Sequence, residues 1–367
     1  MSTPLDEVQE VLLAYYASKG RFPRPKDVTP KEVEDVKSVL SRAFTQMTAQ
    51  HGNQRGNNGL RGTISTLDKD VDKYENEELL KLAREEIPLD ELKAIAEALQ
   101  ESDQSLCYED ALAEALVKWF KPTYFKWIDP IPCSKCKGKT ESKGMGQPTQ
   151  DDLLGGAGRV ELHRCTSCGH TVRFPRYNDP RYLMRSRVGR CGEFANLFAL
   201  FIRAVGLRGR YVWNAEDHVW NEYYSPALKR WVHMDSCENA RDQHLLYDVG
   251  WGKKQSYILA FSTEGAQDVS RAYIKDYDAA LSRRNKISEV ELESALAEVT
   301  RKRRAKLDGQ RRAELEREDE WQARFLRGET EVEASTTSEE ENLPPRQSGT
   351  AEWKAARGED GKHEGSA

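Results

Sequence analysis

The sequence lacks any apolar run long enough to cross a lipid bilayer. A membrane-spanning helix needs about 20 consecutive apolar residues, whereas the best candidate, residues 194–205, is shorter and contains Asn196 and Arg203. The first residues, Met1–Glu7, also lack the basic segment and the apolar stretch of a secretory leader. We therefore expect a protein without a membrane partner that resides in the cytoplasm, with the nucleus as a further location.

An excess of one charge sign is missing as well. The 56 Lys and Arg residues and 61 Asp and Glu residues give a net charge of −5, so no general attraction to nucleic acid is expected. Even the basic run Arg301–Arg304 has acidic residues close by. With 38% hydrophobic and 32% charged residues, the chain is polar for a globular protein, which predicts solvated helices or tails outside a folded core.

Cysteine is sparse, and its seven copies are expected to be thiols or metal ligands, because disulfides are rare in reducing compartments. Four of them form two C-x-x-C pairs, Cys133 with Cys136 and Cys165 with Cys168. This pattern predicts one structural zinc ion (Zn2+) held by four sulfur atoms, which leave no open position for catalysis. The alternatives are a pair of redox-active motifs or four cysteines without a common role. The glycine-rich stretch between the pairs is expected to form a flexible loop.

Three further residues, Cys191, His218 and Asp235, supply a thiol, an imidazole and a carboxylate in this order. These are the nucleophile, the base and the orienting group that covalent acyl transfer requires. Apolar residues follow the cysteine at helical intervals, as far as Gly206. Cys191 is therefore expected in the first turn of a buried helix, where the helix dipole favours a thiolate.

Segments rich in aromatic and β-branched residues predict four strands, at residues 210–214, 218–224, 230–235 and 255–262. The second and third should form a hairpin. If Tyr224 opposes Lys229, the same register places His218 directly opposite Asp235, with Cβ atoms about 4.5–5.5 Å apart on one face. The hairpin would then present the base and the carboxylate together to the thiol.

Each of these residues alone has an ordinary explanation. A cysteine that begins an apolar helix is usually a small buried residue, and a histidine in a strand is usually a hydrogen-bonded polar group. The three residues together, in this order and on these elements, favour catalysis. Cys107, which precedes a predicted helix at 108–120, and Cys237, which no pattern places at a helix start, are assigned no chemistry.

Five blocks follow one another between residues 119 and 274: Gly189–Glu193, Tyr211–Asn214, Asp217–Glu222, Asp235–Glu238 and Trp251–Tyr257. Together they resemble the cytoplasmic peptide:N-glycanases of fungal type, a family of the transglutaminase-like superfamily. The matched region is under half of the chain. The resemblance implies an α+β fold with a transglutaminase-like core of the papain-like cysteine protease type, a zinc-binding lobe, and helical N- and C-terminal extensions.

The resemblance also implies a reaction. Members of this family remove N-linked glycans from misfolded glycoproteins by hydrolysing the amide bond to asparagine, through a cysteine thioester, and leave aspartate. Cys191, His218 and Asp235 match the family's catalytic triad, and the four paired cysteines match its zinc site. Glu238 matches a substrate-contacting glutamate. Trp220 and Trp231 flank the triad and are candidates for an aromatic wall that binds substrate, with core packing as the alternative.

Other proteins of this fold have different functions. Some are transglutaminases or cysteine proteases, and some have lost the triad and act only as binding scaffolds, including one in DNA repair. The zinc pairs and the block Asp217–Glu222 favour the glycanase. The resemblance further implies a partner, a ubiquitin-like shuttle protein that delivers substrates to the proteasome. This partner would bind outside the matched blocks.

The chain divides into four predicted regions. Residues 1–118 are a helical region, 119–280 the catalytic core with the zinc lobe at 130–175, 281–327 a charged helical extension, and 328–367 a disordered tail. Within the first region we expect helices at 5–19, 29–47 and 76–100, and a loop at 52–62. Asn76 should cap the third helix and Pro88 should interrupt it.

Overall fold

The computed structural model describes residues 59–329 and 343–361. The chain divides into two units, residues 1–63 and 64–367, and of the first unit only the start of helix α3 (Gly59–Asp70) is described. The helices predicted at 5–19 and 29–47 lie outside the described residues. The loop predicted at 52–62 is wrong at its end, since residues 59–62 belong to α3.

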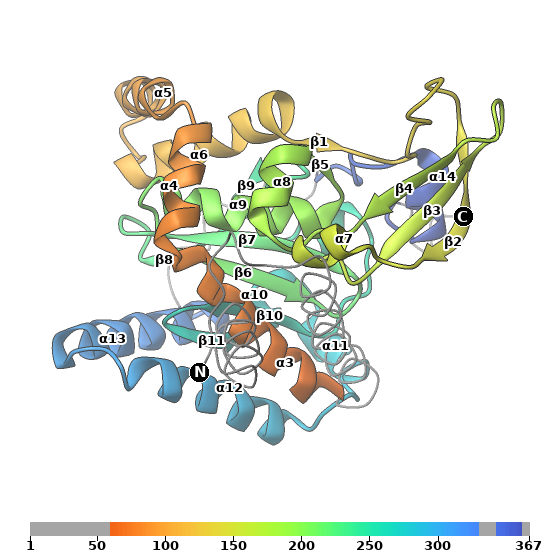
Figure 1. The fold of residues 1–367 in the computed structure, drawn as a ribbon. Helices are drawn as coiled ribbons and strands as arrows, with labels where there is room; N and C mark the ends of the chain where they lie inside the picture. Colours follow the sequence, from red (N-terminus) through yellow and green to blue (C-terminus); the bar gives the residue numbers. More distant parts are fainter. Residues whose placement is uncertain (1–58, 330–342, 362–367) are drawn as a thin grey trace, which may run out of the picture. The chain divides into compact units, whose positions relative to one another are not determined.

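Helices form the N-terminal part of the second unit. After α3 come η1 (Val71–Glu75), α4 (Glu77–Glu86), α5 (Leu89–Ser102), α6 (Tyr108–Trp119) and η2 (Phe120–Tyr124) (Figure 1). The predicted cap is confirmed, because Asn76 Oδ1 accepts the N–H of Leu79 at 3.0 Å. The predicted break is confirmed too. Pro88 separates α4 from α5 because proline has no N–H to donate and restricts the residue before it.

A six-stranded sheet, in the order β11-β10-β6-β7-β8-β9, follows, and every neighbouring pair is antiparallel. Its strands are β6 (Gly209–Asn214), β7 (His218–Ser225), β8 (Arg230–Asp235), β9 (Ala240–Arg241), β10 (Ile258–Ser262) and β11 (Gly265–Asp268). Strands β6, β7 and β8 lie where the sequence predicts them. The last predicted strand begins later than expected, at Ile258, which pairs with Asn214 at the end of β6.

The hairpin of β7 and β8 has a different register from the predicted one. Tyr224 opposes Trp231 rather than Lys229. The turn closes one residue later than assumed, since Ser225 Oγ accepts the N–H of Leu228 at 3.1 Å. The partner of each residue therefore moves by two positions, and because side chains alternate along a strand, every side chain stays on its predicted face.

Helix α9 (Cys191–Ala204) packs on β6 and β7 and is buried along most of its length. Its rings Phe194, Phe198 and Phe201 surround Phe120, with ring centroids 5.8, 5.0 and 5.5 Å away. Burial of one such side chain contributes about 1.5–3 kcal/mol. Gly206 has φ of 90° and ends the helix region as predicted. The aromatic cluster holds α9, and with it Cys191, firmly against the sheet.

Two small sheets lie N-terminal to α9 in the chain. Strands β2 (Thr140–Gly146), β3 (Val160–Cys165) and β4 (Thr171–Pro175) form an antiparallel sheet, and β1 (Lys126–Trp127) pairs in parallel with β5 (Val188–Gly189). The flexible loop predicted between the cysteine pairs is wrong, because β2 and helix α7 (Gln150–Leu154) occupy it. Thr149 and Asp152 form a capping box at α7. Helix α8 (Pro180–Ser186) leads from β4 to β5.

The C-terminal part contains η3 (Leu246–Gly250), α10 (Ser270–Tyr273), α11 (Tyr277–Leu281), α12 (Glu289–Arg304) and α13 (Gly309–Leu326). Helix α12 packs along β11, and α13 contacts β8. The prediction of a disordered tail after residue 327 is wrong for residues 343–361, which include α14 (Ala351–Ala356) and are drawn in dark blue in Figure 1. The amino-acid composition did not predict this ordered segment. Its structure includes a buried ion pair between Arg346 and Glu359, which composition does not reveal.

Candidate active site and metal centre

Cys191 is the first residue of α9 and is half-buried. The Glu193 carboxylate accepts the N–H of Arg190 at 2.9 Å and so fixes the start of this helix. Burial opposes ionisation of the thiol, but the interaction with His218 and the charges of His218 and Arg346 outweigh it. The pKa of Cys191 therefore lies below its ordinary value, as a nucleophilic thiol requires.

His218 and Asp235 form a hydrogen bond of 2.8 Å between Nε2 and Oδ2, and each side chain is 1% exposed. The ladder between β7 and β8 ends at the pair Asn221 and Met234, so the two residues meet beyond its last pair instead of directly opposite each other. Burial would lower the pKa of His218, but the charge and hydrogen bond of Asp235 raise it above the ordinary value.

The second ring nitrogen of His218, Nδ1, is buried and has no regular hydrogen-bond partner among the described residues. It is the nitrogen that remains for the thiol, since Nε2 is bound to Asp235. Interaction with Cys191 also raises the pKa of His218. A raised imidazole pKa beside a lowered thiol pKa favours a thiolate–imidazolium pair. The structure thus brings the three predicted catalytic residues together.

Asp235 accepts further hydrogen bonds that fix its carboxylate. Oδ1 accepts the N–H and the thiol of Cys237, each at 2.9 Å, and the N–H of Glu238 at 3.2 Å. Oδ2 also accepts the hydroxyl of Tyr247 at 2.9 Å. Burial favours the neutral acid, but the charge of His218 and the hydrogen bonds hold the pKa of Asp235 well below its usual range. Asp235 is therefore an anion that orients the imidazole.

A second histidine extends this network. His233 Nδ1 accepts the N–H of Gln243 at 3.3 Å, which leaves the proton of the neutral ring on Nε2, 2.7 Å from the oxygen of Tyr247. Burial lowers the pKa of His233 to about 4, so the ring is neutral at physiological pH. Sequence reasoning missed both residues. The alternation that puts His233 on the same face of β8 as Asp235 was an available signal, whereas no pattern marked Tyr247.

Aromatic rings enclose His218. The centroids of Trp220, Tyr247 and Trp251 lie 5.7, 5.0 and 4.9 Å from its ring. Trp220 is buried in the hydrophobic core. This agrees with the alternative interpretation, in which Trp220 has a packing role. Trp231 lies farther along the same sheet face, with Arg210 4.4 Å from its ring. The structure therefore does not bring Trp220 and Trp231 together into one wall.

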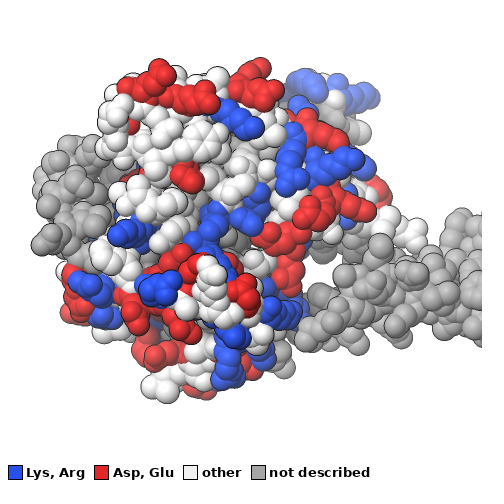
Figure 2. Space-filling view, turned by 90° about the vertical axis from the view of Figure 1, so that its left-hand side faces the viewer, with Lys and Arg blue, Asp and Glu red and all other residues white. Residues whose placement is uncertain are grey.

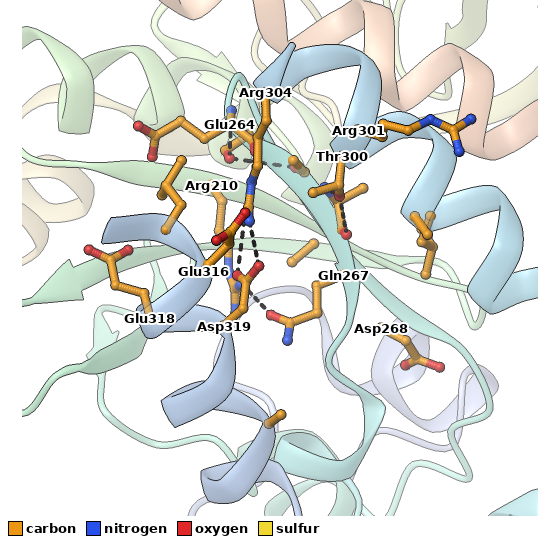
Figure 3. Close-up of a pocket in the computed structure, with 18 of the residues that line it drawn as sticks. Arg210, Glu264, Gln267, Asp268, Thr300, Arg301, Arg304, Glu316, Glu318 and Asp319 are labelled. Carbon is orange, nitrogen blue, oxygen red and sulfur yellow. Dashed lines mark hydrogen bonds and ion pairs between the residues drawn. The ribbon is translucent and has the colours of Figure 1, made fainter. Parts of the chain in front are cut away.

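Trp231 instead lines a pocket of about 900 Å³ between α12, α13 and the β11 edge of the sheet. Some of the polar and charged side chains in it bind one another (Figure 3). Arg304 pairs with Asp319, and Arg210 Nη1 donates to Gln267 Oε1 at 3.0 Å. None of the three predicted catalytic residues lines this pocket, so it lies apart from the predicted triad.

The four paired cysteines meet at one end of the sheet of β2, β3 and β4. The sulfur of Cys136 lies 3.4 Å from that of Cys165 and 3.5 Å from that of Cys168, and Cys133 lies 3.6 Å from Cys168. All four sulfur atoms are within 4.8 Å of one another. Zn–S bonds of about 2.3 Å in a tetrahedron separate the sulfur atoms by about 3.8 Å. These residues can therefore hold one metal ion.

Each cysteine pair forms a tight turn suited to this arrangement. The N–H of Lys137 donates to the carbonyl of Cys133 at 2.9 Å, and the N–H of Gly169 donates to that of Cys165 at 3.1 Å. Both turn residues have positive φ, 61° and 67°. The N–H of Cys168 lies 3.4 Å from the sulfur of Cys165, and this contact, against the cost of burial, lowers the pKa of Cys165 to about 6. Thiolates are the form that binds metal.

Ion pairs connect the sheet of β2, β3 and β4, beside the four cysteines, to helix α9. Glu161 on β3 accepts two hydrogen bonds from Arg190, at 2.9 and 3.1 Å, and one from Arg176 at 3.1 Å. Arg176 in turn binds both carboxylate oxygens of Glu193, at 2.6 and 2.9 Å. Bidentate pairs of this kind fix geometry as well as charge. Because Arg190 precedes Cys191 directly, the sheet helps to position the thiol.

The surface offers no single-sign field on the face drawn in Figure 2, where acidic and basic side chains are intermingled. Acidic and basic side chains of the described residues also pair with each other, for example Arg208 with Glu318 at 2.8 Å. None of the helices in residues 59–329 and 343–361 is long and apolar enough to cross a membrane.

Comparison with known proteins first gives the class. Residues 142–236 match the model of the transglutaminase-like superfamily, and residues 214–327 match that of the Rad4 transglutaminase-like domain. Both matches include His218 and Asp235. The fold is therefore transglutaminase-like, with a cysteine, a histidine and an aspartate at its centre.

Relatives then give the family. The chain is 40% identical over 333 residues to the peptide-N(4)-(N-acetyl-beta-glucosaminyl)asparagine amidase of Yarrowia lipolytica, covering 88% of this chain and 91% of the relative. The amidase of Saccharomyces cerevisiae is 41% identical over 263 residues (70% and 72%), and that of Gallus gallus 42% identical over 299 residues (79% and 45%). The chain belongs to the family of these amidases.

The chain spans most of the fungal relatives but about half of the chicken one. Among solved structures, the complex of Rad4 and Rad23 crosslinked to an undamaged DNA is similar with a TM-score of 0.38 at 12% identity, over 71% of this chain and 59% of that one.

Proposed function

We propose that this protein hydrolyses the amide bond between an N-linked glycan and asparagine, and that Cys191, His218 and Asp235 carry the reaction. The supporting observation is the assembled triad, with a hydrogen bond of 2.8 Å from His218 to a buried, ionised Asp235. The relatives named for this amidase activity share about two fifths of their aligned residues with the chain. The triad supplies what the reaction requires, a nucleophile and a proton carrier.

The first half of the reaction forms a thioester. The Cys191 thiolate attacks the side-chain amide carbon of the glycosylated asparagine. The C–N bond then breaks, and the His218 imidazolium donates the proton on Nδ1 to the departing nitrogen, so that the glycan leaves as a glycosylamine. Asp235 stabilises the imidazolium and holds the ring with Nδ1 toward the thiol.

The second half releases the polypeptide. His218, now neutral, removes a proton from water at Nδ1, and the hydroxide attacks the thioester carbon. The C–S bond breaks and restores the thiolate, and aspartate remains in the polypeptide. The bond broken is an amide, so the pair of spaced carboxylates used by glycoside hydrolases is not needed.

Glu238 is our candidate for substrate contact. Its N–H binds Asp235 at 3.2 Å, which places its side chain beside the triad. We retain Trp220 and Trp231 as weaker candidates, Trp220 for shaping the site from beneath His218 and Trp231 for a sugar bound over the sheet. Their separation in the fold means that they would contact different parts of a substrate.

The metal proposed for the four cysteines is zinc. The support is the donor set of four sulfur atoms at tetrahedral spacing, which suits zinc and excludes an open catalytic position. A structural ion there would hold the sheet that bears Glu161. A four-thiolate site needs reduced cysteines, which supports a cytoplasmic or nuclear location. The proposal also includes misfolded glycoproteins as the substrates and a ubiquitin-like shuttle protein as a partner.

The test is incubation with a denatured high-mannose glycoprotein in isotopically heavy water, followed by mass spectrometry of the peptides. Conversion of the glycosylated asparagine to aspartate with one heavy oxygen, together with release of an intact glycan, is expected. A matched reaction with Cys191→Ala should leave the glycopeptide unchanged. Cleavage of the polypeptide would indicate a protease, isopeptide crosslinks a transglutaminase, and binding without any product a scaffold, and each of these would contradict the proposal.

A further inference from the structure

The C-terminal segment, residues 343–361, lies against the triad. The Glu238 carboxylate accepts the N–H of Gln347 at 2.6 Å and the N–H of Ser348 at 3.2 Å. The Ser348 hydroxyl also bonds to Glu238, and it lies 2.8 Å from the carbonyl of Cys237. Two successive backbone amides and one hydroxyl thus saturate the side chain that we propose for substrate contact.

Arg346 fills the space next to these contacts and is fully buried. Its guanidinium lies 4.6 Å from the ring of Trp251 and 5.3 Å from that of Trp127. Trp251 packs against His218. Trp127 belongs to β1, which is paired with the strand that leads to the catalytic cysteine. The guanidinium therefore occupies the aromatic space beside both reacting groups.

Ion pairs anchor the rest of the segment. Glu359 is fully buried and binds Arg346, Lys253 and Arg357, the last two at 2.6 and 3.1 Å. Burial favours its neutral form, but the charges of Arg346 and Lys253 dominate and lower the pKa of Glu359 to about 2. Arg357 also donates to the carboxylate and the carbonyl oxygen of Asp217, each at 2.7 Å. The anchor thus reaches the residue next to His218.

The contacts follow the spacing of an N-glycosylation site. Such a site has the form Asn-x-Ser or Asn-x-Thr, and the segment reads Arg346-Gln347-Ser348. Arg346 takes the position of the asparagine, and its side chain lies between the aromatic rings beside the triad. Ser348, two positions later, donates its hydroxyl to Glu238.

We propose that residues 343–361 act as a pseudosubstrate, which occupies the polypeptide-binding part of the active site until a glycoprotein displaces it. Arg346 stands where the glycosylated asparagine would enter, and Ser348 stands where the hydroxyl residue of the glycosylation site would bind. An arginine has no amide carbon for the thiolate to attack, so the segment is not consumed. This inference deepens the proposed function and rests on it.

Occupancy by the segment lowers the apparent affinity for substrate in proportion to the open fraction. If the segment is bound nine tenths of the time, the apparent dissociation constant rises about tenfold. The covalent link gives the segment an effective concentration of roughly millimolar, so weak contacts suffice to hold it in place.

The experiment uses the full chain in three variants. Arg346→Ala removes the guanidinium from the site, and Arg357→Ala removes the anchor to Asp217 while Arg346 stays. Arg327→Ala is the matched control, because Arg327 is exposed and its ion pair among the described residues is a local one, with Glu329 at 2.6 Å. For each variant, kcat and KM are measured on a denatured glycoprotein, and tryptic cleavage after Lys354 reports release of the segment.

We expect both tail variants to lower KM by roughly tenfold and to speed cleavage after Lys354, while the control matches the wild type. The kcat should stay unchanged in Arg357→Ala, which retains the charge of Arg346 near Cys191. A peptide of residues 343–361 should inhibit Arg346→Ala competitively at roughly millimolar concentration, and the same peptide with Ala at positions 346 and 348 should not.

Three results would overturn the pseudosubstrate. The first is a constant KM in Arg346→Ala with a fall in kcat as the sole effect, because this arginine would then act on the thiolate without blocking the substrate. The second is no change of KM in either tail variant despite faster cleavage. The third is absence of inhibition by the peptide. Failure of the wild type and every variant to convert asparagine to aspartate would refute the proposed function itself.

Discussion

Tyr247 and His218 share one oxygen of the catalytic carboxylate. The Tyr247 hydroxyl donates to Asp235 Oδ2 at 2.9 Å, and Nε2 of His218 lies 2.8 Å from the same atom. Two donors on one oxygen leave the carboxylate little rotational freedom. Tyr247 is thus a positioning residue, which acts on the reaction through Asp235.

Tyr247→Phe should lower kcat by about 10- to 100-fold at similar KM, since a hydrogen bond to a charged group contributes about 1.5–3 kcal/mol. Steady-state kinetics on a glycopeptide checks this. Tyr273→Phe is the matched control, because its hydroxyl donates to another buried carboxylate, Glu222, at 2.6 Å. The control should lose similar stability in a thermal melt and keep its kcat. Equal kcat losses in both variants would make the effect merely structural.

The two cysteines near Asp235 should behave differently. Cys191→Ala removes the nucleophile, and we expect deglycosylation to fall by several orders of magnitude with the fold retained. Cys237→Ala removes only one weak hydrogen bond to Asp235 and should retain most activity. Burial, together with the charge of Asp235, raises the pKa of Cys237 well above its usual range. An inactive Cys237→Ala beside an active Cys191→Ala would reverse the assignment.

His218 and Asp235 should behave as one unit. Each single alanine variant is expected to lose activity by about 10³-fold or more, and the double variant should lose little beyond the more severe single one. The measurement is a double-mutant cycle on kcat/KM. Fully multiplicative losses would mean that Asp235 acts on the reaction independently of the imidazole.

The pH dependence of alkylation should reveal the ion pair. A lowered pKa means that the thiolate persists to lower pH, so the inflection for modification of Cys191 by iodoacetamide should lie below the ordinary cysteine value of about 8.5. In His218→Ala, the interaction that lowers the pKa is lost while burial remains, so the inflection should move to higher pH. Peptide mass spectrometry of the modified site follows the rate. An unchanged inflection would show that His218 does not hold the thiolate.

Removal of one sulfur ligand should affect metal content, stability and activity together. Cys168→Ser is expected to lose bound zinc, as measured by elemental analysis, and to lower the melting temperature because metal binding is coupled to folding. Cys107→Ser is the matched control, since Cys107 bonds to Asp110 outside the four-sulfur cluster. A metal-free preparation with full stability and activity would contradict a structural metal site.

Much of the site could be predicted because its signals are local. Helical periodicity after Cys191 and alternation in β7 and β8 define the elements and the faces that carry the triad. The hairpin register could not be obtained in this way, because the turn is closed by a hydrogen bond from the Leu228 N–H to the side-chain oxygen of Ser225. The prediction nevertheless placed His218 and Asp235 on one face, since a shift of two positions preserves alternation.

Contacts between residues far apart in the sequence could not be predicted. Tyr247 joins the triad from a π-helical turn that no periodic pattern announces. The order in residues 343–361 rests on Arg346 and Glu359, two charged residues whose burial becomes favourable only when they meet each other and Lys253. Composition alone favoured a solvated tail. Whether such a segment is ordered depends on contacts with residues far away in the sequence. Local sequence patterns do not reveal these contacts.

Glu161 gives the metal-binding sheet and the catalytic helix a common carboxylate, through Arg190 and Arg176. Elements coupled in this way unfold as one cooperative block instead of opening separately. Heating or chelation should then remove the metal site and the nucleophile position in the same calorimetric transition. Partly unfolded molecules that still hold the nucleophile in position would then be rare.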